Sequence, residues 1–214
     1  AFLWSFTIRE PATAPTSQKI LEPLWPILKR PVVASFFVIE LIMLFSHAPF
    51  YSFYSNYLKQ ANYSTTEIGF LWSVGVIAEI IMFAYANVFF TRFSWRMLVA
   101  ICLILTSLRW IMAGLFPDLF AVQFFAQCIH AFSFGLFHLI AMRIIFQNFS
   151  AGQQGRGQAL YSTMWGLGVA IGSILAGHYW EIYTGQVMFV VAGIVVLCGL
   201  FFVKGLPKAV NLSH

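Results

Sequence analysis

Six long apolar runs constrain the fold of this chain more than any other feature. A helix needs about 17–25 mainly apolar residues to cross about 30 Å of hydrocarbon. Because the runs do not alternate between apolar and polar residues as barrel strands do, and a spanning backbone must satisfy its own hydrogen bonds, we predict an all-α polytopic membrane protein with six transmembrane helices. The expected helices are Val32–Tyr54, Ile68–Phe90, Met97–Phe116, Leu119–Ile140, Ala159–Tyr179 and Val187–Val203.

Composition supports the same class. The chain is 60% hydrophobic and only 9% charged, and a soluble domain of this length needs more charge to cover its surface. Cys102, Cys128 and Cys198 all lie inside apolar runs, so no disulfide framework is implied. We find no His-Glu metal motif and no paired Asp, and therefore expect no metal, no cofactor and no enzyme activity.

Basic residues predict the topology. They fall on one side of the six runs, whereas the other side carries only Lys59 beside three acidic residues. By the positive-inside rule the basic side is cytoplasmic, so both ends of the six-helix unit are expected there. We divide the chain into the end of a preceding helix and a cytoplasmic linker (1–30), a six-helix bundle (31–205) and a cytoplasmic tail (206–214). The basic residues are Arg9, Lys19, Lys29, Arg30, Arg92, Arg96, Arg143, Arg156, Lys204 and Lys208.

Three ionisable residues on consecutive helices are expected near the middle of the membrane. At 1.5 Å per residue, Glu79 lies about 16 Å and Arg109 about 18 Å from their helix ends, and His130 lies about eleven residues into the fourth run. Ionisable groups at that depth are costly and mark functional sites by default. We expect Arg109 to bind an anionic group or pair with Glu79, Glu79 to carry a proton, and His130 to relay a proton or bind substrate. The alternative is a static ion pair that holds helices together.

Other polar groups are weaker candidates. Trp110 and Gln127 are predicted to line the substrate path. Glu40, nearer the basic side, is expected to form a structural pair, and His138 to lie at the interface. In the fifth run, small residues at a spacing of four, including Gly168 and Gly172, predict close helix packing.

Two segments carry a family resemblance. The loop Asn87–Arg96 resembles a degenerate cytoplasmic loop motif of the major facilitator superfamily, with Arg92 and Arg96 at its basic positions and Thr91 in place of the usual Asp. The run Gly155–Gly177 resembles the eleventh helix of the phenylpropionate permease group, which is similar to lactose permease. The resemblance covers essentially the whole chain and implies the C-terminal six-helix half of a twelve-helix fold.

The resemblance also implies roles for the midplane residues. Arg109 and His130 match, by span and depth, an Arg and a His that line the central cavity of lactose permease-like symporters and act in substrate recognition and proton coupling. Glu79 lies on the helix that carries an essential Glu in that group. An acidic residue expected one turn after the His is Ser133 here, which implies a larger proton role for Glu79.

These observations predict a proton-coupled symporter of a small organic solute, working by alternating access. An aromatic acid such as 3-phenylpropionate would use Arg109 as its carboxylate partner. A sugar or nucleoside substrate and a non-transporting assembly subunit remain as alternatives. The expected partners are the substrate, protons, the lipid bilayer and an N-terminal six-helix half, with no nucleic acid, and the expected location is a bacterial inner membrane.

Overall fold

The computed structural model describes residues 23–208 and contains six helices long and apolar enough to cross a membrane, which confirms the predicted fold class. The expected preceding helix at Ala1–Ile8 and most of the linker lie outside the described residues. A short helix, α1 (Trp25–Leu28), leads into the first span. The six spans are α2 (Pro31–Gln60), α3 (Thr65–Arg92), α4 (Trp95–Leu115), α5–η1–α6 (Phe120–His130, Ala131–Leu136 and Phe137–Asn148), α7 (Gln154–Trp180) and α8–η2–η3 (Gly185–Leu197, Cys198–Phe201 and Val203–Gly205).

Most helices extend beyond the apolar runs that predicted them. The largest difference is in the fourth span, where α6 ends at Asn148 rather than near Ile140. Helix ends depend on capping groups and not on where apolar residues stop. The start of α3 is a capping box, in which Ser64 Oγ accepts from the Glu67 backbone N–H and Glu67 Oε2 accepts from that of Ser64. A capped polar turn therefore precedes the apolar core of α3.

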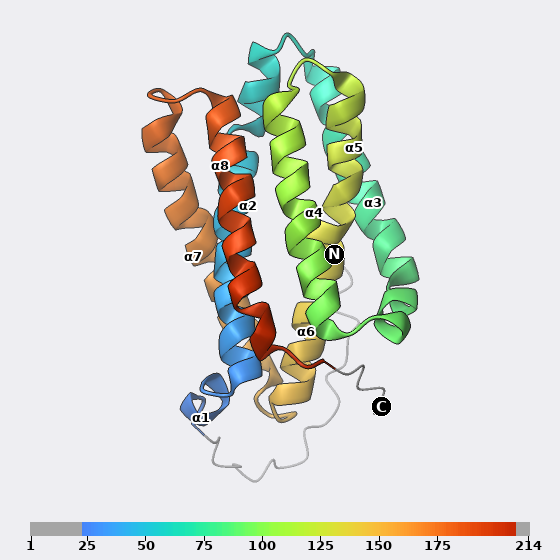
Figure 1. Cartoon of the computed structure of the whole chain (residues 1–214), viewed down its shortest axis with the longest axis vertical. Coiled ribbons are helices and arrows are strands. Elements are labelled where there is room, and N and C mark those ends of the chain that lie inside the picture. Colours follow the sequence, from blue (N-terminus) through green and yellow to red (C-terminus); the bar gives the residue numbers. More distant parts are fainter. Residues whose placement is uncertain (1–22, 209–214) are drawn as a thin grey trace, which may run out of the picture.

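Basic side chains join separate segments at one end of the bundle, which we call the basic end (lower end of Figure 1). Arg30 Nη1 donates to the carbonyl of Asn148 at 2.9 Å. Arg96 Nη2 donates to the carbonyl of Lys204 in η3 and, at 3.0 Å, to that of Leu206. Arg143 Nη2 donates to Asn87 Oδ1 at 3.0 Å. The loops at 61–64, 116–119 and 181–184 lie at the opposite end.

The helices pair in a symmetric pattern (Figure 1). The first span packs on the fifth (α2 on α7), the second on the fourth (α3 on α5 and η1), and the third on the sixth (α4 on α8). The pattern is unchanged when the first three spans are exchanged in order with the last three. The pairing of the first with the fifth then becomes that of the fourth with the second, and the third and sixth stay paired. The bundle is thus two three-helix units of opposite orientation, a repeat that the sequence itself does not reveal and that is known from transporter folds.

The packing of α2 on α7 depends on glycines. A Cβ added to Gly172 would lie 2.5 Å from Ala48 Cβ and 2.7 Å from the carbonyl of Phe45, and one on Gly168 would lie 2.9 Å from Leu44 Cβ. Ser52 and Ser173 share a hydrogen bond of 2.8 Å across the same contact. The predicted close approach of the fifth helix is therefore made specifically to α2.

Gly172→Ala should lower the stability of the bundle, because the new methyl group meets backbone atoms of α2 that cannot move independently. We expect a loss of about 1–3 kcal/mol, typical of overpacking, measured by thermal unfolding in detergent. Gly166→Ala is the matched control, since nothing lies within 4 Å of its added Cβ. Equal effects of the two substitutions would contradict the tight α2–α7 contact.

Candidate functional site

Arg109 is the centre of a buried polar cluster. It projects from α4 and is only 1% exposed. Its Nη1 donates to His130 Nδ1 at 2.7 Å and to Ser133 Oγ at 3.0 Å, and its Nη2 donates to Gln127 Oε1 at 3.3 Å. The guanidinium also lies 4.3 Å from the ring centroids of Phe50 and Trp110, a cation–π arrangement. The charge is therefore held by neutral acceptors and aromatic faces.

His130 connects Arg109 to Glu79. Its Nε2 lies 2.5 Å from Glu79 Oε1. A guanidinium only donates hydrogen bonds, so His130 Nδ1 must be the acceptor from Arg109 and must carry no proton. The imidazole proton then lies on Nε2 and is donated to the Glu79 carboxylate. The three groups form one chain, Arg109 to His130 to Glu79, in which the charges of the first and last cancel.

Local backbone features set this geometry. The fourth span changes from α-helix to π-helix at η1, directly after His130, and π-segments inside α-helices are frequent at functional sites. Across from it, a Cβ at Gly75 of α3 would lie 3.0 Å from Gln127 Oε1 and 3.3 Å from His130 Cδ2. The absence of a side chain at Gly75 lets the fourth helix approach α3 closely enough for Glu79 to reach His130.

The predicted substrate-path residues are covered. Arg109, Trp110 and Gln127 are each 1% exposed. Trp110 Nε1 donates to Ser46 Oγ at 3.4 Å, and the Trp110 ring packs edge-on against His47 at 4.9 Å. Glu79, with 16% of its side chain exposed, is the most open member of the cluster. A ligand therefore reaches Arg109 only by displacing the acceptors that now surround it.

Aromatic rings lie beside the cluster. Half-buried Phe134 stacks on His130 with centroids 5.6 Å apart, and half-buried Tyr51 lies 5.8 Å from Trp165. Phe134 could not be singled out from the sequence, because one of 24 phenylalanines carries no signal of its own. The π-segment that positions it leaves no mark in the pattern either.

Ser133 and His138 have clearer roles than their sequence positions indicate. Ser133, at the position where the family resemblance leads one to expect an acid, is an acceptor for Arg109. The acidic partner of His130 is instead Glu79, on the other side of the ring. His138 was expected at the interface, but it is half-buried and shares a 3.0 Å hydrogen bond with Tyr161 of α7.

The loop-motif arginines lie away from this cluster. Arg96 donates to the carbonyls of Lys204 and Leu206 at the basic end. Arg92 is exposed, and its side chain makes no hydrogen bond or ion pair within the described residues. Both positions are consistent with a structural role for the loop.

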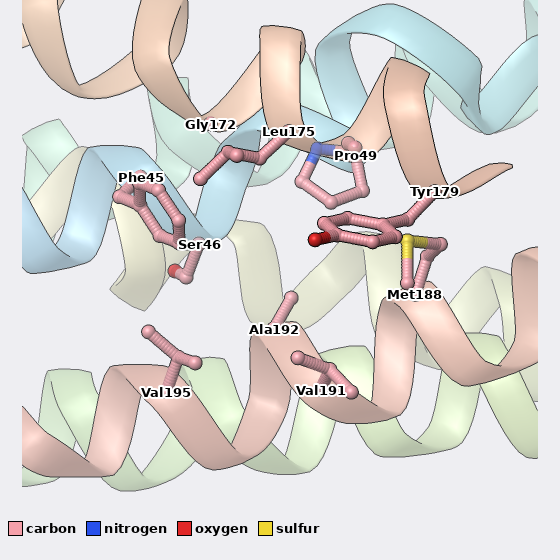
Figure 2. A pocket seen from close by; sticks show the side chains of 11 residues that line it. Phe45, Ser46, Pro49, Gly172, Leu175, Tyr179, Met188, Val191, Ala192 and Val195 are labelled. Carbon is pink, nitrogen blue, oxygen red and sulfur yellow. The ribbon is translucent and has the colours of Figure 1, made fainter. Parts of the chain in front are cut away.

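An apolar pocket lies between α2, α7 and α8 (Figure 2). Its volume is about 220 Å³. It contains no Arg, Lys or His, and its polar groups are the hydroxyls of Ser46 and Tyr179. Such a lining does not suit a carboxylate, so the Arg109 cluster remains the candidate site. Within residues 23–208, no three His, Cys, Asp or Glu side chains gather in a way that could hold a metal ion.

Comparisons with known proteins identify relatives. The family model described as "MFS_1 like family" matches residues 5–191. Over 164 residues the chain is 37% identical to the "Probable 3-phenylpropionic acid transporter" of Escherichia coli (strain K12), an alignment that covers 73% of this chain and 41% of that protein. The chain thus spans less than half the length of this curated relative. No solved structure matches it.

Arg109→Met should destabilise the bundle, because it leaves the Glu79 carboxylate without a compensating charge. Removing one partner of a buried ion pair costs about 3–5 kcal/mol, and we expect the lower end because Glu79 is partly exposed. Adding Glu79→Gln to Arg109→Met should restore part of the loss in chemical unfolding experiments. Strictly additive effects of the two substitutions would show that the chain of contacts carries no coupling.

Proposed function

The chain belongs to the major facilitator superfamily, and from that premise we propose that its six helices are half of a proton-coupled symporter for a small organic carboxylate. Membership of a transporter family points to transport and away from enzyme activity. The observation that carries the proposal is the chain of contacts from Arg109 through His130 to Glu79. It joins a fixed positive charge to a group that can take up a proton.

Proton binding and anion binding are coupled through this chain. With Glu79 ionised, its charge balances that of Arg109, and the site has no net attraction for an anion. When Glu79 takes a proton, the charge of Arg109 is left without compensation in a buried setting, where electrostatic interactions are strong. A substrate carboxylate can then replace His130, Ser133 or Gln127 as the acceptor. One proton thus creates the site for one negative charge.

The substrate class follows from the groups around the cluster. A guanidinium binds a carboxylate through two parallel hydrogen bonds, and the rings of Tyr51, Phe134 and Trp165 can pack against an aromatic substrate. The similarity to a protein named as a 3-phenylpropionic acid transporter supports the same chemistry. We therefore propose an aromatic carboxylate such as 3-phenylpropionate as the substrate.

The transport cycle requires a second wall for the cavity. We propose that a second six-helix half, preceding this one in the complete transporter, faces the open side of Glu79. Rocking of the two halves would expose the site to either side of the membrane in turn. The basic end would face the cytoplasm of a bacterium, following the distribution of Arg and Lys.

Binding of 3-phenylpropionate should weaken as the pH rises, because the ionised form of Glu79 competes with the substrate for Arg109. The limit for one coupled proton is about tenfold in affinity per pH unit. Glu79→Gln resembles the protonated form, so it should bind the substrate with little pH dependence but fail to accumulate it. Calorimetry and uptake into proteoliposomes with an imposed pH gradient measure the two effects.

Glu67→Gln is the matched control, because it changes an exposed glutamate and Gln still completes a capping box. Its pH profile should be that of the wild type. The uncharged amide of the same acid should not bind. Binding of the amide, or of a sugar or nucleoside in its place, would contradict the role of Arg109, and absence of any uptake would favour an assembly subunit.

A further inference from the structure

Glu40 is a buried carboxyl that the coupling described above does not use. It lies on α2, about nine residues and thus about 14 Å from the start of that helix at the basic end. The side chain is 0% exposed, and neither of its oxygens has a hydrogen-bond partner. The structural pair expected from the sequence is therefore wrong, because no partner reaches Glu40 in this conformation.

The protonation state of Glu40 follows from this burial. An ionised carboxylate without hydrogen bonds or a counter-ion is far more costly to bury than a neutral acid, which takes up a proton instead. Glu40 is therefore a neutral acid here. Its hydroxyl and carbonyl still lack partners, which costs about 1–3 kcal/mol for each group.

Tyr161 is an ionisable group on α7, the helix that packs on α2. It projects from α7, is buried, and interacts electrostatically with Glu40. Its hydroxyl shares the 3.0 Å hydrogen bond with His138 Nδ1 on α6. Within the described residues, no Arg, Lys or His of α1, α3, α6, α8 or η3 forms an ion pair or hydrogen bond with Glu40. Tyr161 and, behind it, His138 are thus the groups that can exchange a proton with Glu40.

Phe134 lies between these groups and the candidate site and has no exchangeable proton, so we propose that water passes the coupled proton from Glu79 to His138. Phe134 stacks between two histidines, with centroids 5.6 Å from His130 and 6.1 Å from His138. Glu79 and His138 also interact electrostatically. Three groups of proton-binding side chains therefore lie in this part of the bundle. They are Glu79 with His130, His138 with Tyr161, and Glu40.

We propose that Glu40 is a second proton-binding carboxyl, which receives the coupled proton from His138 through the Tyr161 hydroxyl and releases it at the basic end. Protonated His138 gives its Nδ1 proton to Tyr161 as Tyr161 gives its own to the Glu40 carboxylate, so the tyrosine is unchanged. Neither Glu40 oxygen has a hydrogen-bond partner in this structure, so the transfer requires a conformation in which the Tyr161 hydroxyl reaches Glu40. Separation of α2 and α7 would then admit water and let Glu40 ionise. The inference rests on the proposed proton symport.

Infrared spectroscopy tests the protonation of Glu40 without relying on transport. In the complete transporter at neutral pH, we expect a carbonyl stretch from a protonated carboxyl group. Glu40→Gln should remove this band, and Glu79→Gln should retain it. Persistence of the band in Glu40→Gln, or its absence from the wild type, would overturn the inference. Thermal unfolding establishes that the isosteric variant is folded.

Tyr161→Phe is the second variant, in case Glu40→Gln does not fold. It should keep the carboxyl band but shift its frequency, because the neighbouring hydroxyl is gone. An unchanged band would contradict an electrostatic interaction between the two residues. Tyr183→Phe, at an exposed tyrosine between α7 and α8, is the matched control and should leave the spectrum as it is.

Transport measurements separate this inference from the symport proposal. Glu40→Gln and Tyr161→Phe should retain substrate exchange at equal pH and lose accumulation driven by a pH gradient. If both variants accumulate substrate as the wild type does, symport stands and the role of Glu40 is wrong. If the wild type itself does not accumulate substrate, the symport proposal fails, and with it the coupling role of Glu40.

Discussion

The burial of one guanidinium organises this half of the membrane bundle. Arg109 has no carboxylate in direct contact, so its charge depends on His130, Ser133, Gln127 and the faces of two aromatic rings. Because an unsatisfied charge at this depth is very costly, each of those groups is constrained in orientation. The constraint even reaches Glu79, since the proton position on His130 follows from the hydrogen bond that Arg109 donates.

Several parts of this arrangement could be predicted from the sequence, for physical reasons. The bilayer thickness sets the length of each apolar run, so the number of spans could be predicted from the sequence. Helical rise then placed Glu79, Arg109 and His130 at similar depth. Which of the three side chains contact one another could not be predicted, because an estimate of depth does not say in which direction around the helix axis a side chain points. A direct pair of Arg109 with Glu79 was expected, but in the structure His130 lies between them and contacts both.

The remaining differences come from tertiary packing. Glu40 has the sequence context of a residue near a helix end, where a loop arginine could reach it, but α7 packs so closely on α2 that Glu40 is enclosed. The same packing makes Tyr161, which the sequence places among many membrane aromatics, the neighbour of a carboxyl group. Glycines on α7 cause this closeness, and their partner helix cannot be read from spacing alone.

The π-helical segment of the fourth span has a consequence for the alignment of His130 and His138. It lies between His130 and His138, and its hydrogen bonding is one residue out of register with the α-helices on either side. Restoring α-helical bonding would turn one flank relative to the other by about 100°. The relative orientation of the two histidines therefore depends on the hydrogen-bonding register of the six residues between them.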